Sequence, residues 1–480
     1  MAKLCGLIPA AGKGTRAYPY TENIPKSMLE INGEPNLLRI IRIMRDDLHI
    51  SDIFIVIGHQ GHIIKKYFGD GTQFNVKLTY IQNDLIEKGL AYSIFFGKKF
   101  INDYFVVILS DECYINSNHA ELLTCQYQNS LGVISVMEVT NKELIKKNYS
   151  VEAVNGKVIK LIEKPKLVQN NMLGCGTFVF NPGIFNHLEQ AFTQNTYVDF
   201  ITMINSLCQN GEVLKCFKLI GKYVNINDRD SLQLAKYYVR DYVWDSKLIN
   251  LLIYSEGDEE DIVFSINQYK KSGTLHRIYV LLPHQSSIEN EIRQCDVGII
   301  KCPPGVVLYG EKIKYGLEKM PGDICIITEA NYSFSYRDIS KLLVYLKEAD
   351  MVIGTRTTRQ LIHQRSHMRG RVRMANIMLA KVMELLWWRY ECRFSDVGCT
   401  FRALWKSTFN KIKDNLVTKG PQFSVEMIIE MLRARDRIIE IPVSYYGKSH
   451  SLYRKHQNLY TFFKMLHLIL FRSMKHYFMD

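Results

Sequence analysis

The sequence predicts an α/β protein with two successive Rossmann-like domains and a short amphipathic helix at its C-terminal end. Short runs rich in β-branched residues alternate with helical runs in the first half, and the same alternation begins again near residue 247. Such a rhythm is typical of a mostly parallel sheet with helices on both faces. Large apolar residues mixed with cations near the end of the chain predict the final helix. We therefore divide the chain into residues 1–243, 244–455 and 456–480.

Composition narrows the classes of protein to which the chain can belong. Its 480 residues are enough for two or three domains, and 47% of them are hydrophobic, as in ordinary globular proteins. The formal net charge of +13 predicts an anionic partner: a nucleic acid, an acidic membrane or a phosphorylated substrate. Eleven cysteines without a C-x-x-C pair predict free thiols in a reducing compartment. We therefore expect a cytoplasmic protein.

The first domain is expected to carry its ligand at one edge of its sheet. Strands are predicted at residues 53–58, 76–82 and 104–111, and helices at residues 37–45, before residue 67 and at residues 231–243. These strand runs are short, β-branched and bounded by turn residues. In an open parallel sheet, ligands bind beyond the carboxyl ends of the strands. The loop that follows the first apolar run is therefore the expected site.

That loop, residues 12–26, reads GKGTRAYPYTENIPK. Gly12 and Gly14 let the backbone approach a ligand closely, and consecutive N–H groups in such a loop form a cradle for an anion. Arg16 and Lys26 add fixed positive charge on either side of the cradle. This chemistry suits a nucleoside triphosphate.

Two other phosphate-binding motifs do not fit the loop. A Walker loop ends in Gly-Lys-Ser/Thr, whereas Gly14 is followed here by Thr15 and Arg16. A dinucleotide fingerprint requires a third glycine and an acidic residue about 20 residues later, and the loop does not provide them. The pattern G-x-G-T-R-x-x-P-x-T-x-x-x-P-K instead resembles the signature of the sugar-1-phosphate nucleotidyltransferases.

This resemblance implies a nucleotidyltransferase fold for residues 1–243 and a defined reaction. A sugar 1-phosphate would attack the α-phosphate of a nucleoside triphosphate without a general base, because its oxygen is already anionic. Arg16 and Lys26 are then the expected catalytic residues. The residues expected to bind the nucleotide are Ala11, Gly12, Gly14, Thr15, Gln82 and Gly89. Those expected to bind the sugar phosphate are Glu163, Lys164 and Gly176.

The same resemblance implies a metal site for Mg²⁺ or Mn²⁺. Asp111 ends the strand at residues 104–111, where a carboxylate facing a triphosphate can hold Mg²⁺, although such an aspartate can equally cap a helix. The family carries a second metal-binding aspartate in a stretch that here reads YVNIND, and Asn225 stands in its place, followed by Asn227 and Asp228. An amide oxygen can ligate Mg²⁺ but adds no charge. We therefore expect a working but weaker metal site, with structural loss of the site as the alternative.

The second domain repeats the α/β rhythm. Strands are predicted at residues 276–282, 323–328 and 349–354, and helices at residues 309–319 and 336–347. Residues 247–455 resemble the inverting glycosyltransferases of family 2, in particular the polyprenyl-phosphate hexosyl transferases related to dolichol-phosphate-mannose synthase. The stretches that carry this resemblance are Gly354-Thr355-Arg356, RGRVRMAN, DVGCTFRALWK, PQFSVEMI and IEIPVSYYGKSHS.

This second resemblance implies a GT-A-like fold, a catalytic role for Asp396 and a lipid phosphate as acceptor. Arginine binds phosphate bidentately, so the arginines near Asp396 suit such an acceptor at a membrane surface, although they can equally form a solvated basic face. Arg365, Arg369 and Arg389 belong to this arginine-rich segment. The residues expected to hold the lipid phosphate are Arg356, Arg371, Arg373 and Arg402.

The donor side of the second domain departs from the family. LLPHQSS stands where the family has an acidic run for the nucleotide base, and Glu329-Ala330-Asn331 stands where it has Asp-x-Asp for the metal. Glu329 is then the one acidic metal ligand expected there. Three explanations stay open: an altered donor, catalysis that relies on arginines, and a domain that has lost activity and now binds.

Two hypotheses for function follow. In the first, a bifunctional enzyme makes a nucleotide-sugar and transfers the sugar to a polyprenyl phosphate on the inner face of the cytoplasmic membrane. In the second, the first domain alone catalyses and the second binds a lipid phosphate or a partner. The C-terminal helix suits an anionic bilayer, and it would equally suit a helix docked on the protein or a homo-oligomer contact. Nucleic acid is not expected as a partner, because the basic charge comes without a recognisable nucleic-acid-binding motif.

Overall fold

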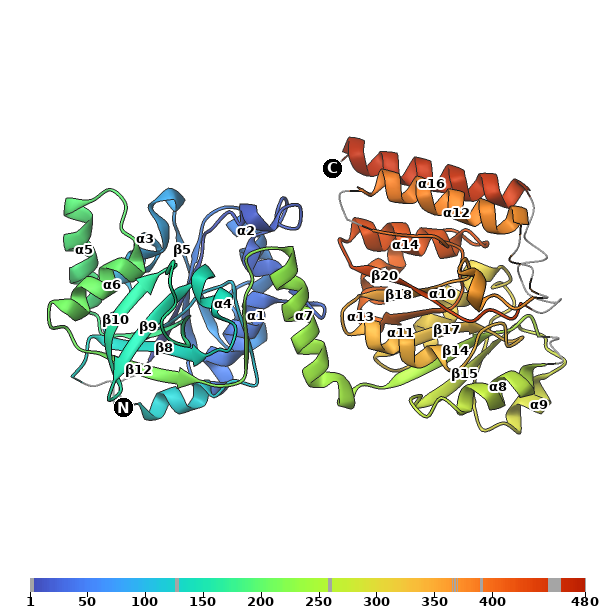
Figure 1. Ribbon diagram of the computed structural model, residues 1–480, viewed down its shortest axis with the longest axis horizontal. Helices are drawn as coiled ribbons and strands as arrows, with labels where there is room; N and C mark the ends of the chain where they lie inside the picture. The colour runs from blue at the N-terminus through green and yellow to red at the C-terminus, as the bar shows by residue number, and fades with distance from the viewer. Residues whose placement is uncertain are drawn as a thin grey trace. The chain divides into compact units, whose positions relative to one another are not determined.

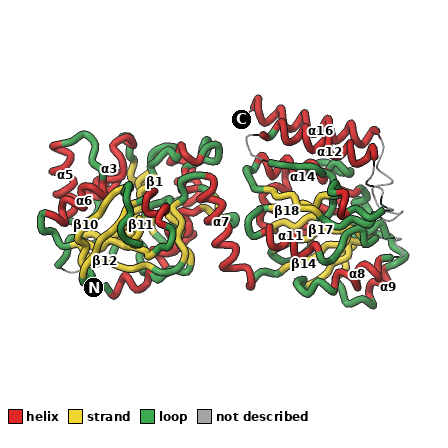
Figure 2. Tube along the Cα trace, viewed as in Figure 1, coloured by secondary structure: helices red, strands yellow, loops and turns green. Residues whose placement is uncertain are grey.

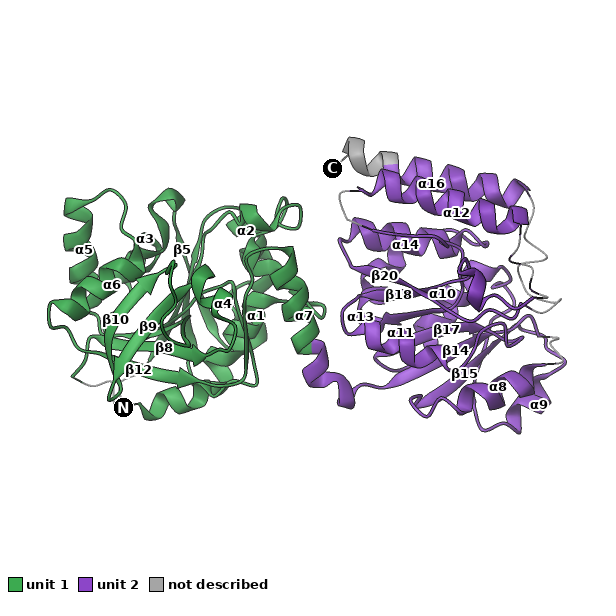
Figure 3. Ribbon diagram, in the orientation of Figure 1, with its two compact units in different colours: residues 1–239 green, residues 240–480 purple. Residues whose placement is uncertain are grey.

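The computed structural model describes residues 4–125, 129–257, 261–364, 366, 368, 370–388, 392–447 and 459–479. Arg365, Arg369 and Arg389 of the arginine-rich segment, and residues 448–451 of the final sequence motif, lie outside the described residues. The chain divides into two compact units, residues 1–239 and 240–480 (Figure 3). Each unit is a mixed α/β structure with its own sheet (Figures 1 and 2).

The sheet of the first unit has nine strands in the order β5-β4-β1-β6-β11-β8-β12-β10-β9. The bounds of its strands are β1 Cys5–Ala10, β4 Asp52–Ile57, β5 Lys77–Gln82, β6 Phe105–Ile108, β8 Gly132–Glu138, β9 Tyr149–Val154, β10 Lys157–Glu163, β11 Met172–Phe180 and β12 Leu214–Leu219. Two further strands, β7 (Glu112–Ile115) and β13 (Lys222–Asn225), pair antiparallel beside it. A short hairpin joins β2 (Glu30–Ile31) and β3 (Glu34–Pro35).

Helices cover both faces of this sheet, because neighbouring residues of a strand point to opposite sides. Leu7 of β1 packs into one core with α3, α5 and α6, and the next residue, Ile8, packs into a second core with α1 and α2. The helices of the unit are α1 Asn36–Arg42, α2 Gly61–Phe68, α3 Gly89–Phe95, α4 Lys142–Lys147, α5 Ile184–Gln194, α6 Phe200–Gln209 and α7 Arg229–Val243. Strand predictions at residues 53–58 and 76–82 are confirmed by β4 and β5.

The expectation of a mostly parallel sheet holds for only part of this unit. Strands β5, β4, β1 and β6 run parallel, so their carboxyl ends share one edge. Beyond them, β11 runs antiparallel to both β6 and β8. A tight turn at Asn155-Gly156 also joins β9 and β10 as an antiparallel hairpin in this half of the sheet.

The sheet of the second unit has seven strands in the order β16-β15-β14-β17-β19-β18-β20. The bounds of the strands are β14 Ile249–Tyr254, β15 Arg277–Leu282, β16 Gly298–Lys301, β17 Ile324–Glu329, β18 Met351–Thr355, β19 Arg402–Trp405 and β20 Ile438–Pro442. Strand β19 is antiparallel to both of its neighbours, and the other pairs are parallel. The predicted strands at residues 276–282, 323–328 and 349–354 are confirmed by β15, β17 and β18.

An outer layer of two long helices completes the second unit. Helices α12 (Gly370–Leu386) and α16 (Leu459–Met479) lie side by side, and α16 also contacts α14 (Phe423–Arg433) (Figure 1). Trp387 at the end of α12 is buried and donates its indole N–H to Ser473 Oγ of α16 at 2.7 Å. The remaining helices are α8 Ile262–Lys270, α9 Glu289–Arg293, α10 Tyr309–Lys319, α11 Asp338–Leu346 and α13 Lys406–Ile412. Within the described residues, no helix is both long and apolar enough to cross a bilayer.

Candidate functional site

The glycine loop of the first unit begins where β1 ends, at the edge that the parallel strands share. Gly14 has a left-handed backbone (φ 66°), and a Cβ at this position would lie 2.9 Å from Lys26 Cβ. The buried hydroxyl of Thr21 donates to Gly14 O at 2.7 Å and closes the loop. Gly12 and Thr15 stay exposed, so the loop presents its backbone to solvent. Glycine at position 14 is therefore required both by conformation and by close approach.

Four side chains meet at this loop. Arg16 Nη2 donates to Asn227 Oδ1 at 2.8 Å, and Lys26 Nζ donates to the same oxygen at 2.8 Å. Lys26 Nζ also lies 2.7 Å from Asp111 Oδ2. The structure thus brings the predicted residues Arg16, Lys26 and Asp111 together, although they lie up to 95 positions apart in the chain. Two cations face one carboxylate and one amide oxygen, which leaves an excess of positive charge for an anionic ligand.

The small β7–β13 pair explains how Asn227 reaches this cluster. Asp111 precedes β7 and Asn227 follows β13, and the two strands pair with Asn225 opposite Glu112. Ile226 N donates to Asp111 O at 2.8 Å, while the Ile226 side chain is buried in the core. From the sequence, Asn227 is only a neighbour of Asn225, the predicted metal ligand. Its position two residues after Asn225 in an extended segment is the signal that could have found it, because alternate residues share a face.

Asn225, two residues before Asn227, contacts a residue outside the four that meet at the loop. Its Nδ2 donates to Asn148 Oδ1 at 2.8 Å, and its own Oδ1 is buried without a hydrogen-bond partner. A buried amide oxygen with no partner is costly unless a ligand or ion completes it. Asn148 O in turn accepts from Lys164 N at 2.7 Å, which links Asn225 to the predicted sugar-phosphate residues.

The predicted sugar-phosphate residues occupy two strands. Glu163 ends β10, and its carboxylate pairs with the exposed Lys164 ammonium at 2.9 Å. Gly176 lies inside β11, where its N–H donates to Glu112 Oε2 at 3.1 Å. A Cβ on Gly176 would lie 2.7 Å from Glu112 Cδ, so this strand position requires glycine. Gly176 is therefore tied to the residue that follows Asp111 in the chain.

Glu112 itself is a buried carboxyl that the sequence analysis missed. Tyr114 Oη and Tyr223 Oη each donate to it at 2.8 Å, in addition to the Gly176 N–H. Burial, together with the nearby charge of Asp111, raises the pKa of Glu112 to about 8. Two of its three donors, Gly176 N and Tyr223 Oη, come from β11 and β13, so the local sequence alone does not distinguish Glu112 from a surface glutamate.

The predicted base-contact residues lie at the same sheet edge but outside this cluster. Gln82 ends β5 and is exposed, with its Nε2 donating to Asp84 Oδ1 at 2.9 Å. Gly89 begins α3 with φ 81°, and a Cβ there would lie 3.0 Å from the Tyr197 ring. Ala11 is buried, and its carbonyl accepts from His59 N at 3.3 Å.

In the second unit, four of the predicted residues are buried: Arg356, Asp396, Arg402 and Glu329. Arg356 Nε and Nη2 donate to Asp396 Oδ2 and Oδ1 at 2.7 and 2.8 Å, and both side chains are fully buried. Arg402 is also buried and donates to the backbone carbonyls of Cys399, Ser424 and Val397. In this structure the guanidinium groups of Arg356 and Arg402 and the carboxylate of Asp396 are therefore occupied by contacts within the core of the unit. Their expected roles in lipid-phosphate binding and catalysis stay predictions.

Glu329 does not form a metal cluster in this unit. It ends β17, it is buried, and Thr400 Oγ1 donates to its Oε1 at 2.6 Å, while its Oε2 has no hydrogen-bond partner. Burial raises the pKa of this carboxyl above its ordinary value. Across the described ranges of the chain, no group of three or more His, Cys, Asp or Glu residues is arranged to hold a metal ion.

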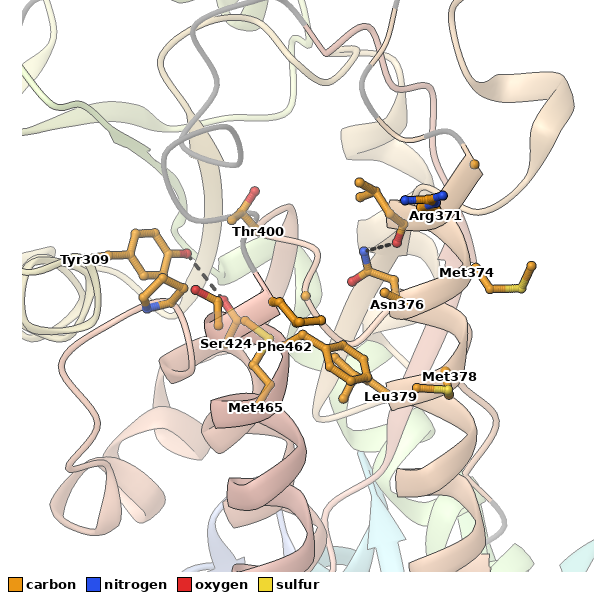
Figure 4. Close-up of a pocket in the computed structure, with 17 residues that line it drawn as sticks. Tyr309, Arg371, Met374, Asn376, Met378, Leu379, Thr400, Ser424, Phe462 and Met465 are labelled. Atoms are coloured by element: carbon orange, nitrogen blue, oxygen red, sulfur yellow. Dashed lines mark hydrogen bonds between the residues drawn. The ribbon is translucent and has the colours of Figure 1, made fainter.

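An apolar cavity of about 940 Å³ lies between α12 and α16 of the second unit. Leu379 of α12 and Phe462 of α16 face one another across it, and Arg371 stands at one end (Figure 4). Arg371 is exposed, whereas Arg373 Nε donates to Thr357 O at 2.8 Å. Of the four arginines predicted to bind lipid phosphate, Arg371 alone borders this cavity.

Comparison with known proteins gives matches for the first half of the chain. Residues 5–261 match the family described as nucleotidyl transferase. The bifunctional protein GlmU of Methanococcus aeolicus is 32% identical over 223 residues, which are 46% of this chain and 50% of that protein. The UTP–glucose-1-phosphate uridylyltransferase AglF of Haloferax volcanii is 28% identical over 234 residues, which are 47% of this chain and 94% of that protein.

Comparison with solved structures also gives matches that cover half of the chain. A putative glucose-1-phosphate thymidylyltransferase from Bacillus anthracis has 23% sequence identity and a TM-score of 0.46, over 50% of this chain and 96% of that chain. A UDP-glucose pyrophosphorylase complexed with UDP-glucose has 20% identity and a TM-score of 0.43. The chain spans about half the length of the GlmU proteins that it matches.

Proposed function

The chain belongs to the nucleotidyl transferase family, and from this premise we propose that its first unit joins a nucleoside triphosphate to a sugar 1-phosphate. The products would be a nucleotide-sugar and pyrophosphate. One observation carries the proposal: Arg16 and Lys26 both donate to one amide oxygen beside the glycine loop, that of Asn227, and Lys26 also donates to Asp111. The names of the relatives, which include a UTP–glucose-1-phosphate uridylyltransferase, support a sugar 1-phosphate as the acceptor.

The proposed reaction needs positioning and charge stabilisation more than proton transfer. An oxygen of the sugar 1-phosphate forms a bond to the α-phosphorus, and the bond between this phosphorus and the β-phosphate oxygen breaks, so pyrophosphate leaves with the electron pair. Arg16 and Lys26 stabilise the charge that develops on the phosphate oxygens. The backbone N–H groups of residues 12–15 hold the triphosphate. Glu163, Lys164 and Gly176 hold the sugar phosphate.

The residues of this site fit a divalent cation. Lys26, itself a cation, lies between the oxygens of Asp111 and Asn227, and Asn225 offers a buried amide oxygen that has no partner. We propose that Asp111 and Asn225 hold Mg²⁺ or Mn²⁺, and that Asn227 supports them. When bound, the ion would supply positive charge to the phosphates.

A pyrophosphate-release assay tests the proposal. The purified chain is incubated with each of four nucleoside triphosphates and a panel of sugar 1-phosphates, and pyrophosphate is measured with and without Mg²⁺. We expect release that depends on both substrates and is lost in Arg16→Ala. Release at the wild-type rate by Arg16→Ala would contradict the assignment.

For the second unit we propose that it binds a lipid phosphate. We further propose that it transfers the sugar of the nucleotide-sugar to this lipid, a polyprenyl phosphate. The apolar cavity bordered by Arg371 supports binding of such a molecule. The alternative is a unit that binds without transfer, which the burial of Asp396 and Glu329 favours. Adding a short polyprenyl phosphate to the assay separates them, because glycolipid forms only if the unit transfers sugar.

A further inference from the structure

The two outer helices of the second unit carry large apolar side chains on their outward faces. On α12 the outward positions are Met374, Met378, Lys381 and Leu385, followed by Trp388 just beyond the helix. These positions recur at intervals of three and four residues, so they form one stripe along the helix. Met374 is 70% exposed, Leu385 75% and Trp388 69%. An outer helix of a soluble domain ordinarily places polar residues there.

Helix α16 repeats this arrangement. Tyr460, Phe463 and Phe471 are exposed at 64%, 55% and 61%, with Lys464 and His467 on the same side. Its inner side is equally apolar, because Ile469 is buried and Phe462 packs into the core. Both helices are thus apolar on two opposite faces, and only the inner one is covered within the described part of the unit. A helix that is apolar all round is normally covered on both sides.

The charges on these helices favour an anionic partner. The described side chains of α12 and α16 include one acidic group, Glu384, and Lys381 and Arg393 both pair with it at 2.6 Å. Arg393 remains highly exposed, and Lys464 lies in the outward stripe of α16. A second copy of the chain on this face would bring identical cations together. An anionic surface instead complements them.

We propose that the outward face of α12 and α16 docks on an anionic lipid bilayer. The described helices are too polar to cross a bilayer, so the pair would lie in the interface with its apolar stripe among the head groups and upper chains. Trp388 and Tyr460 are exposed on this face, and tryptophan and tyrosine side chains favour the membrane interface. The cavity between the helices reaches the same face through Met374 and Leu459, so the bilayer would also cover its opening. The docking does not depend on either proposed activity.

Vesicle sedimentation of the full chain without substrates tests this proposal. We expect binding to vesicles of phosphatidylcholine mixed with phosphatidylglycerol, and much weaker binding to phosphatidylcholine alone. Lys381→Gln combined with Lys464→Gln should weaken binding by roughly tenfold or more, because each cation near an anionic surface adds to the attraction. Leu385→Glu combined with Phe463→Glu should reduce binding to background. Neither of these two residues lines the cavity.

The matched control is Val344→Glu, at a 65% exposed position on α11 of the same unit. It adds a carboxylate to another helix surface and should bind vesicles like the wild type. Far-ultraviolet circular dichroism melts show that each variant is folded. Failure of the wild type to prefer anionic vesicles would overturn the proposal, and so would unchanged binding by the Leu385→Glu, Phe463→Glu variant.

Two further measurements identify the face directly. The chain has four tryptophans, and Trp388 is exposed whereas Trp387 and Trp405 are buried and Trp244 is partly buried. Brominated lipids should therefore quench Trp388 fluorescence, and Trp388→Phe should remove that quenching. Quenching that persists in Trp388→Phe would place the contact elsewhere. Light scattering tests whether a second copy of the chain covers this face instead of a bilayer. A wild-type dimer that becomes monomeric in the Leu385→Glu, Phe463→Glu variant would assign the face to protein contact and overturn the proposal.

Discussion

Arg356 and Asp396 form a bidentate ion pair sealed inside the second unit. The two guanidinium contacts measure 2.7 and 2.8 Å, neither side chain is exposed, and Arg356 N also donates to Asp396 Oδ2 at 3.0 Å. Arg356 follows β18, and Asp396 begins the segment that leads into β19. The pair therefore fixes the loop that precedes an antiparallel strand in an otherwise parallel sheet.

Removing one charge of this pair should destabilise the second unit strongly. Asp396→Asn keeps the side-chain shape but leaves a buried guanidinium without its counter-charge, which costs about 3–5 kcal/mol. All four tryptophans lie in the second unit, so urea unfolding followed by tryptophan fluorescence reports its stability. Arg293→Gln breaks the exposed pair with Glu289 and should cost less than about 1 kcal/mol. Equal loss in both variants would refute the structural role.

Much of the fold followed from the period of the apolar residues. The strands at residues 53–58 and 323–328 were predictable because a short β-branched run bounded by turn residues has few alternatives. The antiparallel course of β11 and β19 was not predictable, because a strand's direction depends on which neighbour it meets. That choice is made by tertiary packing and leaves no periodic trace in the sequence.

The residues of the candidate site also fall into those that the sequence predicts and those that only the folded structure reveals. Arg16, Lys26 and Asp111 were found because each lies in a loop directly after an apolar run or within the spaced motif. Glu112 and Asn227 were missed because the contacts that tie them to Gly176, Tyr223 and Lys26 come from segments more than 60 residues away. The arginines of the second unit were expected on the surface, and two of them are instead buried. Their density suggested a surface, whereas Arg356 and Arg402 are satisfied by a carboxylate and backbone carbonyls that no local pattern reveals.

Arg16→Ala should lower turnover more than substrate affinity. Arg16 is exposed and reaches the cluster through a single 2.8 Å hydrogen bond to Asn227, so its loss leaves the fold intact. A cation that stabilises transition-state charge contributes roughly a hundredfold or more to kcat. Steady-state pyrophosphate release gives kcat and KM separately. Lys66→Ala, at an exposed position on α2, is the matched control and should leave both constants unchanged. A rise in KM alone would indicate a role in substrate binding.

Asn225→Asp should strengthen cation binding. The substitution keeps the shape of the side chain and adds the charge that an amide ligand lacks, and Mg²⁺ and Mn²⁺ favour carboxylates. Titration of the purified chain with Mn²⁺, followed by electron paramagnetic resonance without substrates, measures the affinity directly. Asp111→Asn should weaken it. An increase in Asn227→Asp but not in Asn225→Asp would move the amide ligand from residue 225 to residue 227.

Glu112 should make the first unit less stable as pH rises. Its folded-state pKa of about 8 lies above the ordinary value of 4.5, so the folded chain keeps a proton that the unfolded chain releases between these values. The free energy of unfolding therefore falls with rising pH in this window, by at most about 1.4 kcal/mol per pH unit. His119 has the opposite effect below its ordinary value of 6.5, because burial lowers its pKa to about 4.

Urea unfolding between about pH 6.5 and pH 8 tests the Glu112 contribution, because the His119 contribution fades above pH 6.5, where its imidazole becomes neutral in both states. The first unit lacks tryptophan, so its transition is followed by far-ultraviolet circular dichroism and distinguished from the fluorescence transition of the second unit. Glu112→Gln should flatten the dependence on pH. Glu138→Gln should not, because the pKa of Glu138 lies below its ordinary value beside Lys218 and outside this window. A wild-type stability that stays level from pH 6.5 to pH 8 would show that Glu112 is ionised in the folded chain.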